Sequence, residues 1–187
     1  MYYEDMTITK EDLELFIFKN SEFFNCVFKD ITFDRVSFNG TILENCRFKG
    51  CQLNSSLFEN TKLLDVFFEN SELISINLSS INKFIVEVSF TNSYLKYCDL
   101  SKLDLNKTNF LNSTLKECLF FETNLIKASF NNSSLENSSF DMCNLEMADF
   151  KGATDYRINP LKNRIKGAKF SQSDIIGLVR DFDIKIV

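Results

Sequence analysis

Histidine and tryptophan are absent from this chain of 187 residues, proline occurs once and glycine only five times. Without histidine the chain lacks the commonest general base and the commonest metal ligand of proteins. Catalysis by a Ser-His or Cys-His pair is therefore excluded. Neither a P-loop nor a GxGxxG motif occurs. We therefore expect no catalytic residue, no cofactor and no bound metal, and a protein that is not an enzyme.

Long apolar runs are also missing. No stretch of about 18 consecutive apolar residues occurs, so we expect no transmembrane helix and no membrane partner. The first ten residues include Glu4 and Asp5 and lack the apolar core of a signal peptide. We therefore expect a cytoplasmic protein. The net charge of −5 argues against direct binding to nucleic acid.

Phenylalanine, in contrast, is abundant, and it recurs with leucine at every fifth position. Phe and Leu together make up 42 of the 187 residues, yet they fill all 26 positions of two five-residue series. The first series is Phe18, Phe23, Phe28, Phe33, Phe38, Leu43, Phe48, Leu53, Phe58, Leu63, Phe68, Leu73 and Leu78. The second is Phe90, Leu95, Leu100, Leu105, Phe110, Leu115, Phe120, Leu125, Phe130, Leu135, Phe140, Leu145 and Phe150. Such regularity indicates a repeat that governs the whole fold.

A second position, two residues before each Phe or Leu, is mostly small: Ser, Thr, Cys, Ala or Val. Residues two apart in an extended segment point to the same side, so each unit presents one small and one large side chain inward. A period of five matches neither a helix nor a simple strand alternation. It predicts a chain that turns a corner every five residues, so that four sides close a square coil.

Coils of 20 residues then stack by parallel strand pairing, about 4.8 Å apart, and parallel crossovers favour a right-handed coil. The sequence predicts an all-β fold: a right-handed quadrilateral parallel β-helix, with a short C-terminal α-helix. Residues 20 apart should stack as a core ladder. We expect this ladder to contain Phe90, Phe110, Phe130, Phe150, Leu95, Leu115 and Leu135.

The units resemble those of the pentapeptide-repeat proteins, whose motif is a small residue, Asp or Asn, then Leu or Phe, then two polar residues. Thr123-Asn124-Leu125, Cys143-Asn144-Leu145 and Ala148-Asp149-Phe150 match this motif. The match covers about residues 16–152. It is specific for the fold and much less so for function.

All six cysteines occupy the small inward position: Cys26, Cys46, Cys51, Cys98, Cys118 and Cys143. We interpret them as small apolar side chains that fill the core. Pairs 20 residues apart could suggest a disulfide or a metal site. A cytoplasmic chain stays reduced, however, and the chain has no CxxC motif.

The repeat loses register between residues 79 and 89. Leu78 and Phe90 are 12 residues apart, two more than two full units. One interpretation is a bulge or wide corner that bends the solenoid. The other is a hinge or partner contact, for which Lys83, Phe84 and Ile85 are the candidates.

Three segments follow from the pattern: an N-terminal cap over residues 1–15, a solenoid over residues 16–152, and a C-terminal coil, helix and capping or dimerisation segment over residues 153–187. A solenoid needs caps because its end coils otherwise expose apolar side chains. Ser173 and Asp174 predict a helix start, and Ile184 and Ile186 alternate as in a short strand.

The C-terminal segment resembles that of the Qnr-type and MfpA-type quinolone-resistance branch of the repeat proteins. The resemblance rests on residues 156–160, 169–171 and 175–182. It implies a homodimer joined end to end by this segment. The interface would consist of Ile175, Leu178, Val179 and Phe182, and the alternative is a cap over the last coil.

The charge of the chain is unevenly distributed. Residues 1–151 carry 22 acidic and 14 basic side chains, a net charge of −8, whereas residues 152–170 carry a net charge of +4. The resemblance implies a DNA-mimicking protein that binds DNA gyrase or topoisomerase IV and opposes quinolone-type inhibitors. Qnr-type loops are missing, so the outline is closer to the MfpA type.

Two other functions stay open. One is a structural or regulatory module that binds another protein, and the other is immunity to a toxin directed at gyrase. Phe24, Ile42 and Leu64 are predicted to lie outward on one side of successive coils. A contiguous apolar patch there would favour a protein partner over a DNA-like face.

Overall fold

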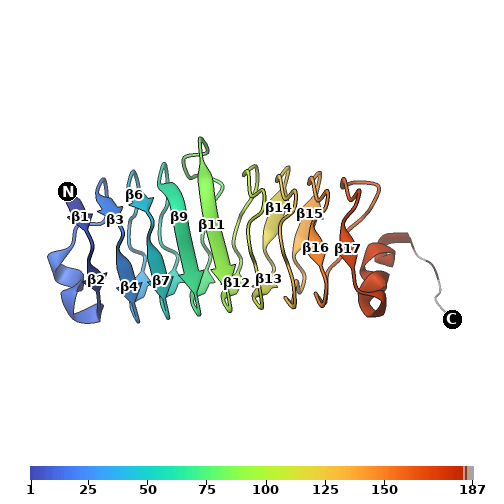
Figure 1. The fold of residues 1–187 in the computed structure, drawn as a ribbon, viewed down its shortest axis with the longest axis horizontal. Helices are drawn as coiled ribbons and strands as arrows, with labels where there is room; N and C mark the ends of the chain where they lie inside the picture. The colour runs from blue at the N-terminus through green and yellow to red at the C-terminus, as the bar shows by residue number, and fades with distance from the viewer. Residues whose placement is uncertain (183, 185–187) are drawn as a thin grey trace.

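The computed structural model describes residues 1–182 and 184 of the chain. It shows a straight rod of stacked coils with the N-terminal strands at one end and the C-terminal 3-10 helices at the other (Figure 1). The strands are short and pair in parallel with residues about one coil away, which confirms the predicted parallel solenoid.

The largest sheet wraps around one corner of the rod. Its first side consists of β1 (Tyr2–Glu4), β3 (Glu22–Phe24), β6 (Ile42–Glu44) and the first half of β9 (Lys62–Glu69). Its second side consists of β2 (Thr7–Ile8), β4 (Val27–Lys29), β7 (Arg47–Lys49) and the second half of β9. β11 (Val86–Thr91) pairs with β9 along both sides.

The third side is a five-stranded sheet of β5 (Thr32–Asp34), β8 (Gln52–Asn54), β10 (Glu72–Ile74), β12 (Tyr94–Lys96) and β13 (Thr114–Lys116). Two further pairs are β14 (Leu119–Phe121) with β15 (Ser139–Asp141), and β16 (Asp149–Phe150) with β17 (Lys169–Phe170). The described residues also include three 3-10 helices: η1 (Lys10–Leu15), η2 (Gln172–Leu178) and η3 (Arg180–Phe182).

The predicted ladders form the core. The rings of Phe90, Phe110, Phe130 and Phe150 stack with centroid separations of 5.3, 4.8 and 4.8 Å, and Phe170 follows Phe150 at 4.9 Å. Leu95, Leu115 and Leu135 are likewise completely buried. Each buried Phe or Leu contributes roughly 1.5–3 kcal/mol of transfer free energy, so these ladders are the main source of stability.

The corners are made by residues in the left-handed backbone region. Over residues 1–182, twenty-four non-glycine residues have φ between 50° and 62°, and nearly all lie two positions after a ladder residue. Thirteen of them are Asn or Asp, the residues that best tolerate this conformation besides glycine. The chain can therefore turn so many corners with only five glycines.

Parallel pairing extends into both terminal segments of the chain. β1 and β2 pair with β3 and β4, so parallel pairing starts at Tyr2, before residue 16. At the other end it continues past residue 152 to Phe170.

The predicted C-terminal α-helix is wrong in type. The segment forms η2 and η3, both 3-10 helices, and the tight 3-10 turn suits a short chain pressed against the last coil. Ile184 lies in no strand, and Ile186 lies outside the described residues. In the described part of the chain, no helix is long and apolar enough to cross a bilayer.

Candidate functional site

Thiols and hydroxyls fill the small inward positions of the described coils, and all six thiols are buried. All six cysteines are free thiols at inward positions, as predicted from their slot in the repeat. Cys46 donates a hydrogen bond to the carbonyl of Phe23 at 3.3 Å, and Cys51 makes the same contact to Phe28. Burial raises the pKa of Cys46 to about 12 and that of Cys51 to about 11. These thiols are therefore protonated near neutral pH and serve as core side chains.

Burial of these thiols predicts a loss of stability in alkali. A thiol whose pKa is raised by folding stabilises the protein below its unfolded pKa of about 8.5, and this contribution disappears as pH rises toward the folded value. We expect the free energy of unfolding to fall above pH 9, by about 1.4 kcal/mol per pH unit for each such thiol. Urea unfolding of wild type and Cys46→Ala at pH 8 and 10 checks this. An equal decline in the two proteins would contradict it.

Outside the core, the first two coils carry carboxylates without cationic partners. Residues 1–44 hold nine acidic and four basic side chains, a net charge of −5. Within the described residues, no ion pair involves this segment, and the first one along the chain joins Arg47 to Glu69 at 2.6 Å. Asp12 is engaged locally: it accepts hydrogen bonds from the Thr9 backbone and hydroxyl, which lower the pKa of its carboxyl. The acidic charge of the rod is therefore concentrated and unneutralised at its N-terminal end.

The basic junction predicted near the C-terminal end is largely neutralised. Four of its five cationic side chains pair with carboxylates of the preceding coil or of η3. These pairs are Arg157–Asp181, Lys162–Asp141, Arg164–Glu146 and Lys169–Asp149. Only Lys166 of this group has no carboxylate within ion-pair distance among the described residues. The segment therefore presents no strong basic patch.

The register break produces a projecting tip in the middle of the rod. Residues 82–85 loop out before β11 begins (Figure 1), where Phe84 is 91% exposed and Ile85 46% exposed. Asn82 fixes the base of this loop. The backbone N–H of Asn82 donates a hydrogen bond to the Thr61 carbonyl at 2.9 Å. The side-chain oxygen of Asn82 accepts one from the backbone N–H of Phe84 at 3.1 Å. The tip is thus an anchored turn that presents an apolar side chain.

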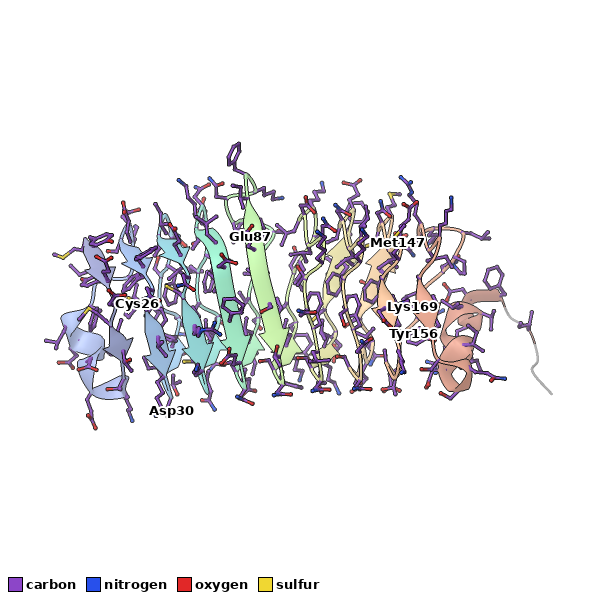
Figure 2. All side chains as sticks on the ribbon, in the orientation of Figure 1. Cys26, Asp30, Glu87, Met147, Tyr156 and Lys169 are labelled. Atoms are coloured by element: carbon purple, nitrogen blue, oxygen red, sulfur yellow. The ribbon has the colours of Figure 1, made fainter. Side chains whose placement is uncertain are left out.

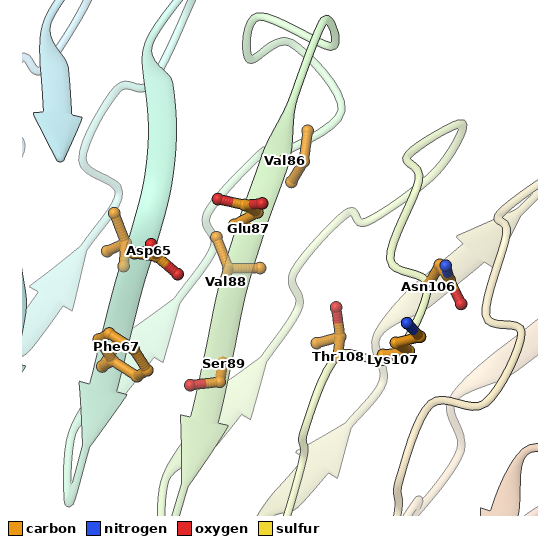
Figure 3. Close-up of a pocket in the computed structure, with 10 residues that line it drawn as sticks. Asp65, Phe67, Val86, Glu87, Val88, Ser89, Asn106, Lys107 and Thr108 are labelled. Carbon is orange, nitrogen blue, oxygen red and sulfur yellow. The ribbon is translucent and has the colours of Figure 1, made fainter. Parts of the chain in front are cut away.

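Beside this tip, the coils separate on one side of the rod. A cleft of about 260 Å³ lies between β9, β11 and residues 106–108, and Asp65, Glu87 and Lys107 line it (Figure 3). Among the described residues, no backbone hydrogen bond joins residues 83–89 to residues 103–108. Pairing resumes where the Phe90 N–H donates to the Asn109 carbonyl at 2.7 Å. The rod is therefore less tightly connected on this side, and the predicted hinge at Lys83, Phe84 and Ile85 stays a prediction.

The four residues predicted to form a dimer interface do not share one environment. Leu178 packs against the core, and Val179 is half-buried. Ile175 and Phe182 are 47% and 40% exposed, and Ile176 joins them with 43% exposure. Leu178 therefore belongs to the cap, while the exposed side chains provide an outer apolar surface.

Tyr156 lies inside this cap, near the C-terminal 3-10 helices (Figure 2). Its ring contacts Phe150 and Phe170, with centroids 5.9 and 5.5 Å away. Its hydroxyl is buried and has no hydrogen-bond partner among the described residues. Burial, with a smaller contribution from Asp174, raises the pKa of Tyr156 to about 12. Neither Tyr156 nor Asn82 was identified from the sequence. The position of Tyr156, an aromatic residue just after the end of the repeat, was the signal that could have indicated a buried side chain in the cap.

Removing that hydroxyl should stabilise the protein. A buried polar group without a partner costs about 1–3 kcal/mol, and Tyr156→Phe removes it while it keeps the ring. We expect an increase of about 1–2 kcal/mol in the free energy of unfolding, measured by urea titration. Unchanged or lower stability would indicate that a water molecule satisfies the hydroxyl.

Comparison with known proteins supports the repeat assignment. The family model described as pentapeptide repeats matches residues 86–120 and 118–154. No curated protein sequence matches the chain.

Three solved structures of low sequence identity align with nearly all of this chain. A trypsin-treated variant of QnrB1, a plasmid-mediated fluoroquinolone resistance protein, aligns with 14% identity and a TM-score of 0.52, over 100% of this chain and 98% of the other. Full-length QnrB1 aligns with 13% identity and a TM-score of 0.41, over 98% and 97% of the two chains. HetL of the cyanobacterium Nostoc sp. strain PCC 7120, involved in heterocyst differentiation regulation, aligns with 10% identity and a TM-score of 0.48, over 99% and 93%. The likeness to the trypsin-treated QnrB1 variant, at 14% identity, concerns the fold alone.

Proposed function

We propose that this pentapeptide-repeat solenoid is a non-catalytic binding protein of the cytoplasm that occupies the DNA-binding surface of DNA gyrase or topoisomerase IV. The observation that carries the proposal is the unneutralised acidic end formed by residues 1–44. The neighbour QnrB1 is a fluoroquinolone resistance protein, and this is the reason to place a topoisomerase first among partners.

The charge density of the acidic end is comparable to that of DNA. Residues 1–44 make a little more than two coils, or about 10 Å of rod, and carry a net charge of −5. Duplex DNA of that length carries about six charges. From Ile8 to Phe170 the rod spans eight coil steps, about 38 Å, where duplex DNA would carry about 22 charges. The acidic end, not the whole rod, is therefore the DNA-like part.

A gyrase supercoiling assay with purified protein tests this proposal. We expect inhibition of supercoiling at micromolar protein, or recovery of supercoiling when a quinolone is present. Glu22→Gln with Glu44→Gln should weaken the effect, while Glu59→Gln with Glu117→Gln provides a control with the same change in charge outside residues 1–44. No effect of wild type with or without the drug would reject the topoisomerase.

The Phe84 tip favours a second candidate, an interaction module for a different protein. An exposed aromatic side chain on an anchored turn is typical of a binding anchor. Phe84→Ser removes the anchor from a fully exposed site, so it should not affect folding. If Glu22→Gln with Glu44→Gln weakens the effect on gyrase and Phe84→Ser does not, the tip is not part of the topoisomerase contact.

The proposal includes a homodimer joined through the C-terminal cap. Exposed Ile175, Ile176 and Phe182 are the contact residues, because Leu178 is already used in the cap. We expect Ile175→Asp to give a monomer by light scattering with unchanged melting, whereas Leu178→Asp should lower the melting temperature. A monomeric wild type would reject the dimer.

A further inference from the structure

One outer side of the rod carries apolar and acidic side chains in a checkerboard, and we call it the acidic-apolar face. It is the outward surface of β1, β3, β6 and the first half of β9. Strand register places the outward residues in two columns. The first column is Tyr2, Glu22, Ile42 and Lys62, and the second is Glu4, Phe24, Glu44 and Leu64.

The apolar side chains alternate between the columns and form a continuous zigzag along the rod. Diagonal neighbours on a sheet lie about 7–8 Å apart, within reach of long and aromatic side chains. Tyr2 is 59% exposed, and Phe24, Ile42 and Leu64 are half-buried. The residues predicted from the sequence to lie outward therefore do lie on one side of successive coils, and Tyr2 extends the series. Charged side chains alternate with them, so this face is acidic as well as apolar.

Carboxylates fill the first three positions of the opposite zigzag, and Lys62 ends it. Glu4, Glu22 and Glu44 are exposed, and none has an ion-pair partner among the described residues. Many carboxylates elsewhere on the rod are paired with a cation one coil away, as in Lys116–Glu136 at 2.7 Å. On this face the acidic charge is available to a partner.

We propose that the acidic-apolar face binds a basic amphipathic α-helix of a partner protein, lying parallel to the rod axis. A helix turn rises about 5.4 Å, close to the coil spacing of about 4.8 Å. Over three coil steps the two differ by only about 2 Å, which flexible side chains absorb. One residue per turn can therefore face each column, with Lys or Arg opposite the carboxylates and Leu or Ile opposite the apolar side chains.

The chemistry of the face argues against other partners. Nucleic acid and anionic lipid surfaces carry negative charge, which Glu4, Glu22 and Glu44 repel. The apolar zigzag would stay unused against a purely polar basic segment, such as an extended lysine-rich chain. A helix with one basic and one apolar stripe satisfies both patterns. This inference does not depend on the topoisomerase, which is one of several proteins that could supply such a helix.

The test uses the full chain and a fluorescein-labelled 18-residue helix of Lys, Leu and Ala arranged in one basic and one apolar stripe. A peptide of the same composition with the stripes scrambled is the control. Fluorescence anisotropy should show saturable binding of the striped peptide at low salt, weaker at high salt. Amide chemical shifts should change in residues 2–4, 22–24, 42–44 and 62–64. No binding of the striped peptide, or equal binding of the scrambled one, would overturn the proposal.

Matched variants locate the contact. Glu22→Gln with Glu44→Gln should weaken peptide binding about tenfold, since it removes two exposed ion pairs. Asp34→Asn with Glu59→Gln removes two unpaired carboxylates from other sides and should leave binding within twofold. Phe24→Thr with Ile42→Thr should weaken it without changing the salt dependence. If both double carboxylate variants lose the same amount of peptide affinity, the peptide is attracted to the overall charge of the protein. That result would overturn the assignment to this face.

Two outcomes separate this inference from neighbouring ones. If gyrase binds wild type and the Glu22 and Glu44 variants equally, while the striped peptide distinguishes them, the helix site stands and the topoisomerase contact lies elsewhere. If sedimentation shows that wild type self-associates and that Glu22→Gln with Glu44→Gln abolishes this, the occupant is a second copy and the proposal fails.

Discussion

Phe110→Ala should lower the free energy of unfolding by about 3–5 kcal/mol, the usual cost of truncating a fully buried phenylalanine. The Phe110 ring is completely buried between Phe90 and Phe130, at centroid separations of 5.3 and 4.8 Å. Phe120 meets it edge-on at 6.0 Å. Because the coils above and below are held at the strand spacing, they cannot move together to close the cavity.

A urea titration followed by circular dichroism measures this loss. Phe84→Ala provides the control, since it makes the same substitution at a side chain that is 91% exposed, and it should change stability by less than about 0.5 kcal/mol. A loss below about 1 kcal/mol for Phe110→Ala would mean that the coil interior relaxes around the missing ring and that the stack is not rigid.

That stack could be predicted from the sequence because the ladder depends only on spacing. Phe110 and Phe130 are 20 residues apart, and a square coil with five residues a side brings such residues together wherever the period holds. The same arithmetic would have placed Tyr3, Ile8 and Leu13 below Phe23, Phe28 and Phe33. Tyr3 and Ile8 do pair in that register. The five-residue spacing therefore extends upstream of Phe18 through Leu13 and Ile8 to Tyr3, although the Phe and Leu pattern that marks it does not.

Other features could not be obtained from spacing. The choice of 3-10 over α-helix in the C-terminal segment depends on how closely it lies against the last coil. The pairing of Arg157 with Asp181 also depends on how that cap folds back. The charge of residues 152–170 alone therefore indicated a basic patch that the structure does not have. The checkerboard of the acidic-apolar face needed strand register. Phe24 and Glu44 become neighbours only once β3 and β6 are paired.

Gly177→Ala should displace the C-terminal cap. A Cβ atom at Gly177 would lie 2.4 Å from the Tyr156 ring and 2.5 Å from the Tyr156 carbonyl oxygen, well inside van der Waals contact. The ring is held by Phe150 and Phe170, so the cap must move instead. Alanine favours helical backbone over glycine by about 1 kcal/mol, but overpacking of this kind costs about 1–3 kcal/mol or more.

Hydrogen exchange measured by mass spectrometry resolves this displacement. The Ile158 N–H donates to the Gly177 carbonyl at 3.0 Å, so peptides that cover residues 153–160 and 172–182 should exchange faster in Gly177→Ala, while those of the central coils should not. Gly167→Ala is the control, because its nearest side-chain contact would be 3.5 Å and it lies outside the cap. Its left-handed φ of 73° should cost stability locally and leave residues 172–182 protected. Should Gly177→Ala exchange like wild type, the close seating of Gly177 on Tyr156 would not be what holds the cap. Leu178 would then have to hold it through its contact with the core.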